Sequence, residues 1–185
     1  MRIIGGKARG TKLYTLDGIE TRPTLDRVKE SLFNILQNDI SESIVLDLFS
    51  GSGAIGLEFM SRGAKKAYLC DASKEAIKII KQNAEKTHMQ DQVEILNLDF
   101  KKAIFNLKDI KFDLIYLDPP YKTTFIRDSL DIILDIKCYK KDTIIILETD
   151  EKERIEAEIE KLKSIEIIDE RKYGRANLIF LKIIK

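Results

Sequence analysis

Histidine is nearly absent from this chain of 185 residues, and cysteine and proline are scarce. The sequence holds one histidine, two cysteines and three prolines. A single histidine cannot build a metal site from several histidines. We interpret His88 as a surface residue near a helix end, so no catalytic triad built on imidazole is expected. Cys70 and Cys138 lie far apart and form no CxxC pair, so the sequence predicts free thiols in a reducing compartment, not a zinc site.

Long apolar runs are missing as well. None approaches the roughly 20 residues that a membrane-spanning helix needs. The first ten residues, MRIIGGKARG, lack the apolar stretch of a secretory signal. A hydrophobic content of 44% is nevertheless enough for a folded core. From these absences we expect a cytoplasmic protein without a membrane partner.

The chain also has no large excess of positive or negative charge, because 32 Lys and Arg nearly balance 31 Asp and Glu and leave a net charge of +1. The first twelve residues differ, since Arg2, Lys7, Arg9 and Lys12 occur there without any acid. A polyanionic partner contacted by this segment would explain the local excess. An ordinary solvated terminus explains it equally well on charge alone.

Short apolar runs alternate along the chain with segments whose apolar residues recur at helical spacing. The expected strands span 44–49, 66–70, 93–96, 112–117 and 143–148. The expected helices span 54–62, 74–87, 100–108, 124–136 and 151–162. Strands and helices that alternate over short connections predict βαβ units, and hence a parallel, doubly wound sheet.

The two ends of the chain follow other patterns. At the start, a β-hairpin of residues 2–4 and 12–15 is expected to lead into an amphipathic helix over Thr24–Asn38. At the end, residues 164–172 and 177–185 are rich in β-forming side chains. No crossover helix fits between these two runs, so they should pair antiparallel.

We therefore expect one α/β domain over residues 1–185. Its sheet should be Rossmann-like, with five parallel strands and a C-terminal antiparallel hairpin, seven strands in all. Residues 1–40 would form an N-terminal arm and helix, and residues 41–185 the catalytic core. No repeat, linker or low-complexity tract indicates a further boundary.

A glycine-rich loop, from Asp47 to Gly56 (DLFSGSGAIG), ends the first expected parallel strand and opens a helix. Gly51 and Gly53 let the backbone turn tightly and approach a ligand, and Gly56 lets the helix pack close to the strand. Asp71 ends the next strand, where its carboxylate can bind two ribose hydroxyls. This combination favours an adenosine-containing cofactor over a mere tight turn.

Asp47 indicates which adenosine cofactor is expected. NAD would place a pyrophosphate at the helix N-terminus, where a neighbouring carboxylate is unfavourable. S-adenosylmethionine has no phosphate, and its methionine end carries an ammonium beside a sulfonium, so Asp47 favours this cofactor. Asp99, after the third strand, can accept from the adenine amine. It can also serve as a helix N-cap, and the two roles are compatible.

The sequence Asp118-Pro119-Pro120-Tyr121 follows the fourth strand, at the edge where open α/β sheets bind ligands. The prolines donate no N–H and hold the carbonyls of this turn rigidly. Asp118 and the Pro119 carbonyl can accept the two N–H groups of a nucleobase amine, which aims its lone pair at a sulfonium methyl group. Tyr121 can stack on a flipped-out base. The alternative is a strand-ending turn with a core tyrosine.

The segments DLFSGSGAIGLE and DPPY resemble class I S-adenosylmethionine-dependent methyltransferases that act on exocyclic amines. Three further segments, RIIGGKARG, RPTLDRVKESLFNIL and RKYGRANLIFL, resemble one subfamily nearly end to end. It comprises the RsmD-like bacterial enzymes that methylate guanine N2 in small-subunit (16S) ribosomal RNA. DPPY alone is shared with DNA adenine-N6 methyltransferases, so the other segments carry the substrate assignment.

The resemblance implies roles for individual residues. The target base would be held by Asp118, Pro119 and Tyr121. S-adenosylmethionine would be held by Gly51, Gly53, Asp71 and Asp99. RNA would be faced by Arg2, Lys7 and Arg9, with Arg22, Thr24 and Arg27 at the mouth of the site. The expected partner is ribosomal RNA within a small-subunit ribonucleoprotein particle, met by a monomer without a metal ion.

Three other functions remain open on sequence alone. A DNA adenine-N6 methyltransferase is disfavoured because the catalytic core nearly fills the chain, leaving no evident target-recognition domain. An NAD-dependent oxidoreductase is disfavoured by Asp47 and DPPY. A non-catalytic RNA-binding module is disfavoured because the glycine loop, the ribose-binding acid and DPPY are all intact.

Overall fold

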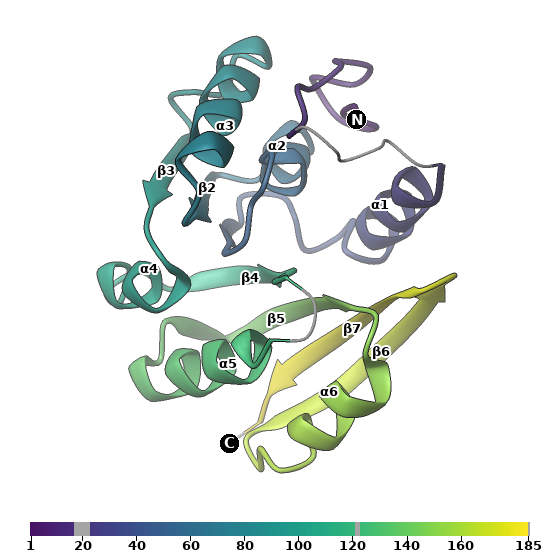
Figure 1. The fold of residues 1–185 in the computed structure, drawn as a ribbon, viewed down its shortest axis with the longest axis vertical. Helices are drawn as coiled ribbons and strands as arrows, with labels where there is room; N and C mark the ends of the chain where they lie inside the picture. Colours follow the sequence, from purple (N-terminus) through teal and green to yellow (C-terminus); the bar gives the residue numbers. More distant parts are fainter. Residues whose placement is uncertain (17–22, 121–122, 185) are drawn as a thin grey trace.

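The computed structural model describes residues 1–16, 23–120 and 123–184, and shows one sheet with helices on both sides (Figure 1). The strands are β1 Ile44–Asp47, β2 Lys66–Asp71, β3 Val93–Asn97, β4 Phe112–Leu117, β5 Tyr139–Thr149, β6 Ile165–Tyr173 and β7 Ala176–Ile183. The helices are α1 Pro23–Ile35, α2 Ala54–Ser61, α3 Lys74–Lys86, α4 Phe100–Asn106, α5 Phe125–Ile136 and α6 Lys152–Ile159.

The strand order is β3-β2-β1-β4-β5-β7-β6, which confirms the expected seven-stranded sheet. Strands β1 to β5 pair in parallel, and β7 runs antiparallel to both β5 and β6. The chain moves outward in one direction from β1 and in the other from β4. The carboxyl ends of these two strands therefore form the switch point where open α/β sheets bind ligands.

Two apolar layers cover the sheet. Helices α1, α2 and α3 pack on one face, burying side chains such as Leu32, Leu57 and Ile80. Helices α4, α5 and α6 pack on the other, with Ile104, Ile133 and Ile155 buried. Figure 1 shows the two groups of helices on opposite sides of the sheet. Because both faces are covered, the central strands are apolar on both sides, as the continuous Ile and Leu runs predicted.

Three of the differences between the expected and the observed element boundaries have a plain local cause. Helix α1 begins at Pro23, because proline has no N–H to lose in the first turn, and ends at Ile35, where a tight turn begins. Strand β1 stops at Asp47, since Leu48 and Phe49 already belong to the glycine loop. Strand β5 starts at Tyr139 and not at residue 143, because the polar residues 140–142 interrupt the apolar pattern from which the strand was predicted.

The expected N-terminal hairpin is a single antiparallel bridge between Arg2 and Lys12, supported by hydrogen bonds from Ile3 N–H to the Thr11 carbonyl and from Leu13 N–H to the Met1 carbonyl. We call residues 1–16 the arm. No helix in the described part of the chain combines the length and apolar character that a membrane span requires.

Glu58 of α2 fixes the arm to the core. Its carboxylate is fully buried and accepts from the N–H groups of Ile4 at 2.9 Å and Gly5 at 2.8 Å. It also pairs with Nζ of buried Lys29 at 3.1 Å and with Nε of Arg62 at 2.9 Å. Every oxygen is therefore engaged, and the helix that follows the glycine loop also holds the arm.

We predict that Glu58→Ala destabilises the protein by about 3–5 kcal/mol, because it leaves the Lys29 ammonium buried without its counter-charge. Two arm N–H groups lose their acceptor at the same time. Thermal unfolding measures the stability, and limited proteolysis within residues 1–16 measures release of the arm. The control is Glu94→Ala, which removes an exposed ion pair with Lys66 and should change stability by less than about 1 kcal/mol. Equal effects of the two substitutions would contradict this role.

Candidate active site

Asp47 lies at the carboxyl end of β1 with only 1% of its surface exposed. Its Oδ2 accepts the Gly56 N–H at 3.1 Å, and its carbonyl accepts the Ser50 hydroxyl at 2.7 Å. A Cβ on Gly56 would lie 1.9 Å from Leu69 Cδ2 and 3.3 Å from Asp47 Oδ2. Glycine at position 56 therefore lets α2 pack closely against Leu69 of β2 while its N–H donates to the Asp47 carboxylate.

Gly51 and Gly53 form the loop between β1 and α2, both with positive φ, 54° and 78°. The Gly51 N–H donates to Asp71 Oδ2 at 2.9 Å, and the Ser73 N–H donates to Asp71 Oδ1 at 2.8 Å. The carboxylate of Asp71 is thus fixed beside the loop, with lone pairs left for a further donor. Apart from its two chain neighbours, no described residue has an atom within 4 Å of the position that a Cβ on Gly51 would occupy, so a ligand can approach this backbone.

Two cavities open at this edge of the sheet and share Phe49, Gly51 and Asp118. The larger, of about 520 Å³, is also bordered by Asp71, Asp99 and the two prolines of the DPPY segment. The smaller, of about 190 Å³, is bordered by three acidic residues, Asp47, Asp118 and Glu148, and by Tyr116 and Lys29 among others. Asp118 therefore stands where the two cavities meet.

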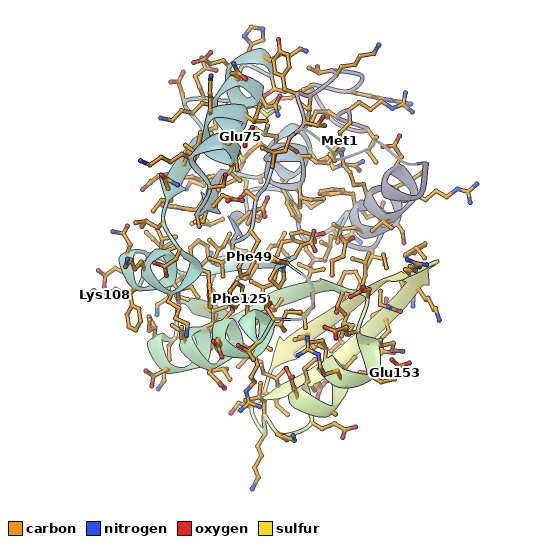
Figure 2. All side chains as sticks on the ribbon, viewed as in Figure 1. Met1, Phe49, Glu75, Lys108, Phe125 and Glu153 are labelled. Atoms are coloured by element: carbon orange, nitrogen blue, oxygen red, sulfur yellow. The ribbon has the colours of Figure 1, made fainter. Side chains whose placement is uncertain are left out.

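Three phenylalanines border the larger cavity and were missed by the sequence analysis. The ring of Phe49 lies 5.5 Å from that of Phe100 and stacks on that of Phe125 at 6.2 Å. Figure 2 shows Phe49 and Phe125 close together. Phe49 belongs to the glycine loop, and the other two are the first residues of α4 and α5. The sequence did place aromatic residues at the starts of two helices that follow parallel strands, and this pattern could have indicated that they border the ligand site.

Asp99 is the N-cap of α4, which is one of the two roles expected for it. Its side chain accepts the Lys102 N–H at 3.1 Å, and this hydrogen bond lowers the pKa of the Asp99 carboxyl. The same residue borders the larger cavity, so the cap leaves it within reach of a ligand there.

Carboxylates in the smaller cavity are poorly compensated. Burial raises the pKa of Asp47 to about 7. Burial and the neighbouring charges of Glu148 and Asp47 raise the pKa of Asp118 well above its usual range, and burial also raises the pKa of Glu148. Tyr116 donates its hydroxyl to Glu148. Within the described residues no group of three or more His, Cys, Asp or Glu side chains is arranged to hold a metal ion.

One oxygen of this cluster lacks a partner. Oδ1 of Asp47 is buried and makes no hydrogen bond within the described ranges, although the residue borders the smaller cavity. An unpaired buried carboxylate oxygen is unfavourable, and a cationic or N–H-bearing ligand would relieve it. Lys29 does not serve this purpose, because its ammonium is held by Glu58 and the Arg2 carbonyl.

Four of the basic residues expected to face RNA lie within the described ranges, and all four are on the surface. Arg2 is 3.6 Å from Asp26, Lys7 donates to Gln92 at 2.8 Å, and Arg9 and Arg27 are exposed. Arg22 and Tyr121 lie outside the described residues, and Thr24 is described only as part of the α1 backbone.

The RKYGRANLIFL segment forms the end of β6 and the start of β7. Its Tyr173 contacts Ser31 of α1 through a hydrogen bond between the two hydroxyls. Since β7 begins beside the end of β5, this turn lies at the same edge of the sheet as the two cavities.

A family model and a curated relative both match most of this chain. A family described as "Conserved hypothetical protein 95" matches residues 1–182. "Ribosomal RNA small subunit methyltransferase D" of Haemophilus influenzae is 37% identical over 154 residues, which cover 81% of this chain and 79% of that protein.

Solved structures share the fold. One from Escherichia coli has a TM-score of 0.83 at 24% identity, over 100% of this chain and 98% of that one. A tRNA m1G37 methyltransferase of Methanocaldococcus jannaschii has a TM-score of 0.70 at 20% identity, over 90% of this chain and 51% of that one. At these identities the likeness shows the fold alone, and the fold is the expected seven-stranded α/β sheet.

We predict that Asp47→Asn stabilises the protein increasingly as the pH rises from 5 to 8. A carboxyl whose pKa is raised from 3.8 to about 7 on folding binds a proton more tightly in the folded state. Its contribution to stability is present below the unfolded value and is lost as the pH rises through about 7. The gain is of the order of 4 kcal/mol at most.

Thermal unfolding of the ligand-free protein at several pH values measures this difference. Asp91→Asn, at an exposed position, is the matched control and should leave the pH dependence of the wild type unchanged. A stability difference between Asp47→Asn and wild type that stays constant across this pH range would show that Asp47 is ionised throughout.

Proposed function

This chain belongs to the family described as conserved hypothetical protein 95, and we propose that it transfers a methyl group from S-adenosylmethionine to the exocyclic N2 amine of a guanine in small-subunit ribosomal RNA. The name of the Haemophilus influenzae relative supports ribosomal RNA as the substrate. The position of Asp118 is the main support for methyl transfer to an amine. Asp118 borders both the larger cavity, which suits a nucleoside, and the smaller one, which is lined by carboxylates.

The residues of the larger cavity fit the adenosine part of the cofactor. Asp71 would accept from the two ribose hydroxyls, since its oxygens are already oriented by the N–H groups of Gly51 and Ser73. The rings of Phe49, Phe100 and Phe125 offer an apolar wall for the purine, and Asp99 can accept from its amine.

The smaller cavity fits the charged end of the cofactor. The unpartnered Oδ1 of Asp47 would accept from the ammonium group, and this contact would return the Asp47 carboxyl to its ionised form. The glycine loop fits a ligand without phosphate, because a buried carboxylate next to the start of α2 would repel a pyrophosphate. When bound, S-adenosylmethionine supplies an electrophilic methyl group on a sulfonium.

Asp118 and Pro119 would act on the target amine. The amine lone pair is delocalised into the guanine ring, so N2 is a weak nucleophile. The Asp118 carboxylate and the Pro119 carbonyl would accept its two N–H groups and direct the lone pair toward the methyl carbon. The amine gains the methyl group and loses one proton. Asp118 can take up this proton, because burial raises its pKa well above that of an ordinary aspartate.

The exposed basic residues of the arm would bind the RNA backbone. Arg2, Lys7 and Arg9 are carried by a segment that Glu58 holds in a fixed position. Arg27 lies on the exposed side of α1. A net charge of only +1 suits a partner met over a small footprint, as a structured ribonucleoprotein particle would be.

We predict that Asp118→Ala lowers the rate of methyl transfer by at least a hundredfold and changes the affinity for S-adenosylmethionine by less than threefold. The reason is that the acceptor matters most in the transition state. Single-turnover transfer of a labelled methyl group to small-subunit ribosomal RNA measures the rate, and calorimetry measures cofactor binding.

Asp118→Asn separates positioning from charge, because its amide oxygen still accepts while the negative charge is gone. Partial activity would show that positioning dominates. Asp71→Ala is the matched variant on the cofactor side and should weaken S-adenosylmethionine binding by tenfold or more. Wild-type transfer rates in Asp118→Ala would refute the assignment of the DPPY segment to catalysis.

A further inference from the structure

Glu148 is a second carboxylate, beside Asp118, and no sequence motif predicted its place there. It lies near the end of β5, and the parallel register pairs Leu117 of β4 with Leu147 of β5. Asp118 directly follows β4 and Glu148 is the next residue of β5, so both stand at the same edge. Neighbouring strands lie about 4.8 Å apart, and both residues border the smaller cavity.

Glu148 has no cationic partner among the described residues. It is half-buried, and the hydroxyl of Tyr116, which is itself buried, donates to its Oε2. No Lys or Arg in the described ranges forms an ion pair with it. A desolvated carboxylate without a counter-charge is unfavourable in the free protein. A ligand that brings hydrogen-bond donors would offset this cost.

Guanine supplies such donors in adjacent positions. The ring N1–H lies next to the exocyclic N2 amine, so a guanine whose amine is held by Asp118 presents N1–H to a neighbouring acceptor. Adenine differs, because the ring nitrogen beside its amine is an acceptor and would face a carboxylate unfavourably. Two neighbouring carboxylates therefore match the edge of guanine and oppose that of adenine.

We propose that Glu148 determines base specificity by accepting the N1–H of the target guanine while Asp118 holds its N2 amine. The inference rests on the proposed function and names the feature of the base that the site recognises. Tyr116 is a positioning residue in this arrangement, since its hydroxyl occupies one oxygen of Glu148 and orients the carboxylate. The remaining lone pairs of the carboxylate serve the base.

The test uses 2-aminopurine, which carries the same exocyclic amine as guanine but has an acceptor at N1. Once the methylated guanosine has been located in small-subunit ribosomal RNA, ligated RNA is prepared with either guanosine or 2-aminopurine riboside at that position. The wild-type enzyme should prefer guanosine by at least tenfold in kcat/KM. In Glu148→Gln, whose amide can donate to N1, the preference should fall by at least tenfold.

Two matched variants distinguish recognition from packing. Glu148→Asp keeps an acceptor and should keep the preference for guanosine, although both rates fall. Tyr116→Phe keeps the carboxylate but removes the hydroxyl that orients it, so the preference for guanosine should fall by less than it does in Glu148→Gln. Calorimetric binding of S-adenosylmethionine identifies the variants that are folded.

The outcomes separate this inference from the proposed function. If the wild-type enzyme does not methylate RNA containing guanosine, the proposed function fails whatever Glu148 does. If it does, but the preference is the same in Glu148→Gln as in wild type, the role of Glu148 is overturned. Loss of the preference in Glu148→Asp or Tyr116→Phe to the same extent as in Glu148→Gln would also overturn it, because packing would then explain the effect.

Discussion

Uncompensated negative charge at the carboxyl edge of β1, β4 and β5 is the constraint on which the site depends. Asp47, Asp118 and Glu148 border one small cavity, and the described residues offer them an N–H group and a hydroxyl but no ion pair. Desolvation raises the pKa of each carboxyl. Such a cavity favours ligands that bring positive charge or N–H donors, and the proposed cofactor and base together supply both.

A second buried charge cluster, around Glu58, places the rest of the proposed active surface. The helix that begins at the glycine loop carries Glu58, and Glu58 binds both the arm and Lys29 of α1. The loop that would hold the cofactor and the segment that would hold RNA are therefore attached to one short helix. Their separation in the free protein is therefore set by the contacts of Glu58.

The fold was largely predictable from the sequence, because strand and helix periodicities alternate without interruption between Ile44 and Ile159. The glycine loop, Asp71 and Asp118 were also predictable, since backbone geometry restricts which residues can occupy a strand-to-helix turn. Their proximity follows from topology, as the carboxyl ends of parallel strands meet at one edge.

Other features needed three-dimensional information. Glu148 ends an apolar run, where it is indistinguishable from any polar residue that closes a strand. Phe100 and Phe125 resemble ordinary core residues until α4 and α5 are placed beside the glycine loop. Lys29 and Glu58 have the spacing of solvated helix charges, and only the packing of α1 against α2 reveals that both are buried. Side chains whose role depends on a partner distant in sequence leave no local pattern.

The account is tested most directly by identifying the methylated nucleoside. Small-subunit ribosomal RNA from a strain that lacks the gene is incubated with the protein and labelled S-adenosylmethionine, digested to nucleosides, and separated with mass detection. The account predicts N2-methylguanosine as the one labelled nucleoside, absent from the untreated RNA. Label in N6-methyladenosine, or no label in the RNA at all, would contradict it.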